Sequence, residues 1–217
     1  MSRVAFRLLV GCLAVLLTVP GGMLDDSPLD SAGKGKKSRT VTKTFANGAP
    51  IAINSQGSAS PFPSRVLVRG FRRAKITDID LVLRGFGHDI PYDVDVLLAA
   101  GDRRNALVMS DVGSAAVNGL TLRLDDEAAG SMPVSPAPLT SGTFRPTNHA
   151  DNNGADAFDA TYAPLPSGAT ALSTFDGINP NGEWLLFVSD DTGGFGGLIT
   201  EGWELRITAK AKGKKKA

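Results

Sequence analysis

The 217-residue sequence predicts an all-β protein, built as a sandwich or barrel. Short apolar runs of strand length recur along the chain, and glycine, proline, asparagine and aspartate separate them, as expected for strands joined by turns. Beyond the first 24 residues, no window of helical length has a clean 3.6-residue period. The length suits one domain with terminal extensions, and we find no internal repeat.

The N-terminal segment, Met1 to Leu24, has the layout of a secretory signal peptide. Arg3 and Arg7 precede a short apolar run that ends at Pro20. This run is short for a membrane helix, so we expect a secreted protein whose mature chain has no membrane span; an uncleaved anchor is the alternative. The only cysteine, Cys12, lies in this segment, so the mature chain can form no internal disulfide.

The predicted order is a signal peptide (1–24), a basic linker (25–39), a folded body (40–209) and a disordered lysine-rich tail (210–217). The body has 12 basic and 19 acidic side chains, although the whole chain has a formal charge of +1. The linker and the tail each carry a run of lysines, which can hold anionic envelope polymers or simply be solvated, disordered ends. Neither run interleaves aromatic residues, so we expect no nucleic-acid binding.

The first strands are predicted at Val41–Phe45 and Pro50–Ile53, around the strong hairpin signal Asn47-Gly48. Val66–Val68 is a third strand. Lys75–Arg84 alternates as a half-buried strand does. Its residues Thr77, Ile79, Leu81 and Leu83 share one face.

The middle of the chain contributes a near-continuous apolar strand at Val94–Ala99 and two further strands at Ala106–Met109 and Gly119–Leu124. From Asp125 to Leu172 the chain is rich in proline, glycine, asparagine and aspartate around one short extended piece, Gly142–Arg145. Irregular segments of that length are usually functional or flexible.

The last two strands contain both tryptophans of the chain. Trp184–Val188 is an apolar run expected to be buried on both faces, and Trp203–Thr208 alternates as a half-buried strand does. The acidic, glycine-rich stretch Ser189–Gly197 is predicted as the loop between them. We expect both tryptophans in the core; an exposed Trp203 or Phe195 would instead favour stacking on a sugar.

Several motifs, in this order, resemble the P domain (P/Homo B domain) of subtilisin-like proprotein convertases, over about residues 44–208. They are SASPFPS (58–64), ITDIDLVLRGFGHDIPYDVDVLL (76–98), LRLDDEA (122–128), SGTFRPTN (141–148), LSTFDGINPNGEWLLFVSDD (172–191) and GGLITEGWELRI (196–207). The resemblance implies a jelly-roll β-sandwich related to galactose-binding-like folds.

The resemblance also implies a non-catalytic module that binds or stabilises a partner such as a subtilisin-like serine protease. The chain has no room for a protease domain before Thr40, so we expect a free-standing, monomeric version. The rival interpretation is a carbohydrate- or cell-envelope-binding module on the same fold, to which the basic tail adds electrostatic retention.

Catalytic chemistry has few candidates in this sequence. A Ser-His-Asp hydrolase needs a histidine between its partners, yet only His88 and His149 occur, each in a predicted loop and without a nucleophile-elbow motif. For His88 a hydrogen bond within a turn is the expected role. The mature chain has too few cysteines and histidines for zinc. We therefore expect no enzyme.

Calcium is the expected ion, because it takes oxygen ligands from carboxylates in loops of exported proteins. The candidate ligands form three groups: Asp89, Asp93 and Asp95; Asp125, Asp126 and Glu127; and Asp190 with Asp191. Some P domains bind calcium, and these positions match acidic blocks of that family. The alternative for each group is an aspartate that caps a turn of its own backbone. Asp93 and Asp95 share a strand face, which suits an ion as well as a sugar bond.

Overall fold

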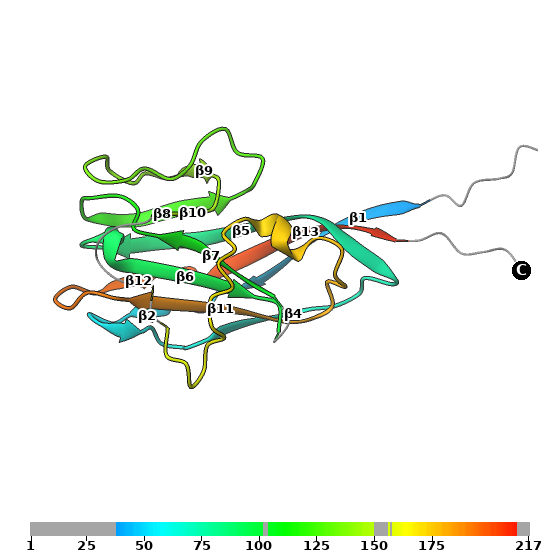
Figure 1. Ribbon diagram of the computed structural model, residues 1–217, viewed down its shortest axis with the longest axis horizontal. Helices are drawn as coiled ribbons and strands as arrows, with labels where there is room; N and C mark the ends of the chain where they lie inside the picture. Colours follow the sequence, from blue (N-terminus) through cyan, green and yellow to red (C-terminus); the bar gives the residue numbers. More distant parts are fainter. Residues whose placement is uncertain (1–37, 102–103, 150–155, 157, 212–217) are drawn as a thin grey trace, which may run out of the picture. The chain divides into compact units, whose positions relative to one another are not determined.

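The computed structural model describes residues 38–101, 104–149, 156 and 158–211. The predicted signal peptide and most of the linker and tail lie outside these residues. The described part consists of two mixed β-sheets and two short 3-10 helices, which confirms the predicted all-β sandwich (Figure 1). Neither of these helices has the length and apolarity needed to cross a membrane.

The larger sheet has seven strands. Five follow one another in the order β1 (Arg39–Asn47), β13 (Trp203–Ala211), β5 (Ala74–His88), β12 (Gly197–Ile199) and β2 (Ile51–Ile53). β8 (Val117–Leu124) pairs with β5, and β9 (Gly142–Phe144) pairs with β8. β5 is the longest strand and connects most of this sheet.

The smaller sheet has six strands. Its order is β10 (Thr147–Asn148), β7 (Asn105–Ser110), β6 (Val94–Ala99), β11 (Gly182–Asp190) and β3 (Gly57–Ser58), with β4 (Ser64–Val68) also paired to β11. The 3-10 helix η1 (Pro91–Asp93) leads into β6, and η2 (Leu172–Phe175) precedes β11. β6 is buried along its whole length, as its apolar sequence predicts.

Both tryptophans lie in the core, each 1% exposed, as predicted. The indole N–H of Trp203 donates to the hydroxyl of Ser64 (2.9 Å), and that of Trp184 donates to the carbonyl of Pro180 (3.0 Å). Buried indoles require such partners. Trp203 is therefore unavailable for stacking on a sugar, whereas Phe195 is 48% exposed.

β5 does not alternate as predicted. Ile79, Leu81 and Leu83 are buried, but Asp80 (1% exposed) and Val82 (8% exposed) of the other face are buried too. At the start of the strand, Thr77 is exposed and Ile76 is buried. The ladder to β13 shifts at this point: Thr208 pairs with Asp78, whereas Ala209 pairs with Ile76. This bulge leaves Thr77 without an opposite residue and turns its side chain away from the core.

The hairpin predicted at Asn47-Gly48 is wrong, because β1 and β2 do not pair with each other. Asn47 pairs with Trp203. Ile51, four residues after Asn47, pairs with Ile199, which lies four residues before Trp203. The two segments are thus one interrupted edge running along β13 and β12. The side-chain oxygen of Asn47 accepts a hydrogen bond from the Ala49 amide (3.0 Å), so the asparagine forms a local kink rather than a hairpin turn.

The two tryptophan strands belong to different sheets, so the segment between them crosses the sandwich. β11 extends to Asp190, and β12 begins at Gly197, which shortens the predicted loop. β13 continues to Ala211, so Lys210 lies in a strand rather than in the predicted tail.

Candidate metal centre

Several strand ends bring aspartates together at one end of the sandwich. Asp95 at the start of β6 pairs with Ser189 near the end of β11, so Asp190 and Asp191 follow directly beside it. The amide of Asp191 donates to the carbonyl of Asp93 (3.0 Å). We call the side chains of Asp93, Asp95, Asp111, Asp156, Asp190 and Asp191 the carboxylate cluster.

His88 and Asp190 form a fully buried pair beside this cluster. The Nε2 atom of His88, the last residue of β5, lies 3.1 Å from Oδ2 of Asp190, and both side chains are 0% exposed. The other ring nitrogen, Nδ1, lies 2.8 Å from the carbonyl oxygen of Ile90. The turn contact expected for His88 is therefore present, although the residue lies in a strand and not in a loop.

Asp95 is a buried member of the cluster with one unsatisfied oxygen. It is 2% exposed, and its Oδ2 atom has no hydrogen-bond partner among the described residues. The nearby hydroxyl of Ser110 lies 2.9 Å from Oδ2 of Asp111 and 2.8 Å from Oδ1 of Asp156. One hydroxyl hydrogen can serve only one acceptor at a time. Asn148 donates to the other oxygen of Asp156 (3.2 Å), and the hydroxyl of Thr192 donates to Asp191 (3.1 Å).

Asp80 shows how this fold satisfies a buried carboxylate where no ion is needed. It is 1% exposed, and its Oδ2 atom lies 3.0 Å from Arg123 and 3.2 Å from Arg206. In the carboxylate cluster no arginine or lysine among the described residues forms an ion pair with Asp93 or Asp95.

Burial and mutual repulsion raise the pKa of several cluster members. Burial raises the pKa of Asp95 to about 8, with further increases from Asp156, Asp191 and Asp111, while Ser110 lowers it. Burial raises the pKa of Asp93 to about 6, and the charges of Asp190 and Asp191 add to this effect. The pKa of Asp190 is also raised by burial, and His88 partly offsets the increase. The cluster thus retains protons that an ordinary aspartate would release.

The donor set of the cluster suits a hard cation. Carboxylates, a serine hydroxyl and backbone carbonyls are the oxygen ligands that calcium prefers. Within the described ranges, no three acidic, histidine or cysteine side chains already surround one point at metal-ligand spacing. The side chains would therefore have to close around an ion, which is compatible with the flexible coordination of calcium.

The other predicted ligands lie outside this cluster. Asp89 is exposed at the rim of a groove. Asp126 accepts hydrogen bonds from the amides of Leu172 (2.9 Å) and Ser173 (2.7 Å) at the start of η2. Asp125 accepts the Glu127 amide (2.9 Å). Asp125 also lies 3.3 Å from Arg123, and a hydrogen bond between the side chains of Asp125 and Glu127 raises the pKa of Glu127. Asp125 therefore caps a turn of its own backbone, the alternative role that the sequence left open, whereas Asp126 caps the distant helix η2.

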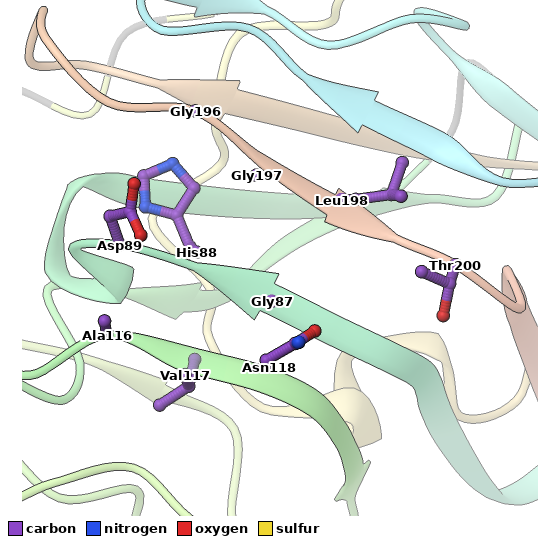
Figure 2. A pocket seen from close by; sticks show the side chains of 10 residues that line it. All are labelled: Gly87, His88, Asp89, Ala116, Val117, Asn118, Gly196, Gly197, Leu198 and Thr200. Atoms are coloured by element: carbon purple, nitrogen blue, oxygen red, sulfur yellow. The ribbon is translucent and has the colours of Figure 1, made fainter.

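An open groove of about 370 Å³ adjoins His88, between β5, β8 and β12 (Figure 2). Its floor is formed largely by glycines, and Asn118 and Thr200 supply the polar side chains away from His88 (Figure 2). A Cβ atom on Gly197 would overlap the carbonyl of Gly87 and the ring of His88. Close packing of two strands against the histidine therefore explains this glycine without a ligand.

The two histidines contact backbone groups. Nδ1 of His88 faces Ile90, and Nε2 of His149 lies 3.3 Å from the carbonyl of Met132. A catalytic histidine needs one nitrogen free for the proton of a nucleophile. Both ring nitrogens of His88 have partners, Ile90 and Asp190, which favours a structural role for His88.

Sequence reasoning missed three members of the site: Ser110, Asp111 and Asp156. Ser110 and Asp111 directly follow the apolar run of β7, and this position at a strand end is a signal that could have found them. Asp156 lies in the long irregular segment, where no periodicity marks it.

Comparison of the chain with protein-family models, with curated proteins and with solved structures finds no match. The P-domain resemblance therefore remains a hypothesis, and the function has to be argued from the geometry of the site.

Proposed function

We propose that this protein is a non-catalytic binding module whose carboxylate cluster holds calcium. The observation that carries the proposal is the buried Oδ2 atom of Asp95, which has no hydrogen-bond partner in the described part of the chain. Without an ion, burial keeps Asp95 protonated at neutral pH. A bound cation would let it ionise, since buried charges are normally paired or coordinate a metal.

Calcium fits better than zinc or magnesium. Zinc prefers cysteine and histidine ligands, whereas the cluster consists of oxygen donors. Magnesium demands near-ideal octahedral geometry and keeps its waters, whereas calcium accepts six to eight oxygens in irregular arrangements. An ion on Asp95 would also remove the repulsion from Asp111, Asp156 and Asp191 that raises its pKa.

Titration calorimetry with CaCl2, together with thermal melts in calcium or chelator, tests the proposal. We expect calcium to bind and to raise the melting temperature of the wild-type protein, and Asp95→Asn to weaken binding at least about tenfold, since an amide oxygen ligates without charge. Asp89→Asn is the matched control, because Asp89 is exposed and outside the cluster. Equal calcium responses of the wild type and Asp95→Asn would refute the site.

The partner of the module is a separate question. The P-domain resemblance favours a secreted subtilisin-like serine protease, and co-purification of the two proteins would support that choice. The rival, retention on an envelope polymer, is favoured by the distribution of positive charge described next.

A further inference from the structure

Two neighbouring strands place lysines side by side at the end of the larger sheet. Lys210 of β13 pairs with Thr40 of β1 on one side and with Lys75 of β5 on the other. Arg39, the first residue of β1, pairs with Ala211. Figure 1 shows the beginning of β1 beside the end of β13. Residues more than 130 positions apart in the sequence thus carry their charges side by side.

The segment between β4 and β5 adds three arginines, Arg69, Arg72 and Arg73, all exposed. Arg72 lines a groove of about 290 Å³ together with Arg39 and Lys43. The Nζ atom of Lys43 donates to the carbonyl of Gly70 (3.0 Å) and lies 5.4 Å from the centre of the Phe71 ring. This cation–π contact fixes the lysine in the groove.

These cations are not neutralised by the rest of the described chain. We call the following residues the cationic end: Arg39, Lys43, Arg69, Arg72, Arg73, Lys75 and Lys210. None of them forms an ion pair with a described carboxylate, whereas Arg65, Arg84, Arg123 and Arg206 each do. Like charges directly opposite each other, as in Lys75 and Lys210, destabilise a sheet. Such an arrangement suits a surface that meets an external anion.

The sequence outside the described residues continues this charge. Lys34, Lys36 and Lys37 come just before Arg39, and Lys212, Lys214, Lys215 and Lys216 come just after Ala211. Within the described residues, Arg39 and Ala211 are paired.

The chemistry of this surface indicates an extended, hydrophilic anion. The exposed aromatic residues among those described, Tyr162 and Phe195, do not lie on the strands or the loop that form the cationic end, so no platform for stacking bases accompanies the charge. β1 instead exposes the hydroxyl-bearing residues Thr40, Thr42 and Thr44 on the sheet face that also carries Lys210 and Lys75, because alternate residues of a strand face the same side. Hydroxyls and cations together match the hydroxyl and carboxylate groups of an acidic sugar polymer.

We propose that the cationic end binds an acidic polysaccharide, with the row formed by Thr40, Lys210 and Lys75 at its centre. The inference rests on the proposed function only in treating the chain as a binding module. It uses no residue of the carboxylate cluster, so the two proposals can fail separately.

The test measures binding of the full secreted chain to immobilised polygalacturonate and to neutral dextran, in chelator, over a range of salt concentrations. We expect binding to polygalacturonate alone, and Lys75→Gln/Lys210→Gln to weaken it about tenfold at low salt and to reduce its salt dependence. Arg65→Gln/Arg84→Gln is the matched control, with the same change in charge at paired arginines, and should change affinity less than about twofold.

Three results would overturn the inference: equal losses in the two double variants, equal binding to dextran, or tighter binding to duplex DNA or to anionic lipid vesicles than to polygalacturonate. Asp95→Asn separates the two proposals, because it should lose calcium binding and keep polysaccharide binding. If Asp95→Asn binds calcium like the wild type while the polysaccharide results hold, only the calcium proposal fails.

Discussion

Replacing Asp95 with asparagine removes one buried charge and keeps the shape of the side chain. The pKa of Asp95 is about 8 in the folded protein, against about 3.9 in an unfolded chain. Between these values the unfolded chain has released its proton and the folded protein has kept it. Without calcium, the contribution of Asp95 to stability is therefore complete below about pH 4 and is lost at ~1.4 kcal/mol per pH unit as the pH rises toward 8.

At about pH 7 this loss amounts to at most roughly 4 kcal/mol in the calcium-free protein. Asparagine is neutral at every pH. Without calcium, the unfolding free energy of the variant should therefore depend less on pH, and the variant should be more stable than the wild type near pH 8. Calcium should reverse the order, because only the wild type offers the carboxylate that the ion neutralises. We therefore expect the wild type to be less stable than Asp95→Asn without calcium and more stable than it with calcium.

Urea unfolding, followed by the fluorescence of the buried Trp184 and Trp203, measures this at several pH values between about 5 and 8. Each protein is measured in chelator and in calcium, with Asp89→Asn as the control that should follow the wild type. The reasoning is refuted if the same protein is the more stable one both in chelator and in calcium. It is also refuted if, in chelator, the unfolding free energies of the two proteins change equally with pH.

Three further outcomes follow from the contacts. Asp126→Ala should lower the unfolding free energy by about 1 kcal/mol, since two amides lose their acceptor. Calcium should raise the melting temperature of this variant as much as that of the wild type. Trp203→Phe should cost about 2 kcal/mol in urea unfolding, because core volume is lost and Ser64 keeps only Asn47 (3.2 Å) as a side-chain donor. Trp203→Phe/Ser64→Ala should cost less than the sum of the two single variants. Calcium affinity should fall by up to about tenfold per pH unit as the pH falls from about 8 to 6, because the ion displaces the proton of Asp95. Calorimetry in two buffers of different ionisation enthalpy would detect the released protons.

The strands could be predicted from the sequence because burial repeats locally. The apolar run of β6 and the alternation of β13 correspond directly to their burial. Pairing is not local. Asn47-Gly48 has the composition of a hairpin turn, but the partners of its neighbours, Trp203 and Ile199, lie about 150 residues away. The bulge at Thr77 likewise depends on β13 and has no signal in its own segment.

The carboxylate cluster was only partly predictable for the same reason. Asp125-Asp126 and Asp190-Asp191 are both acidic pairs close to the end of an apolar strand, so the sequence treats them alike. Their surroundings differ. Asp126 faces the free amides that begin η2 and serves as their cap, whereas Asp190 is buried against His88. Which role an aspartate takes depends on residues from other strands, and these become neighbours only on folding.

The two proposed sites lie at opposite ends of one strand. β5 has Lys75 near its beginning, at the cationic end, and His88 as its last residue, beside the carboxylate cluster. Thirteen residues of strand span about 43 Å, several times the screening length of about 8 Å at physiological salt. The two charge sets should therefore act independently, and the effects of Asp95→Asn and Lys75→Gln/Lys210→Gln should add. A protein held on a polymer by its cationic end would point the carboxylate cluster away from that polymer, so retention and calcium binding need not compete.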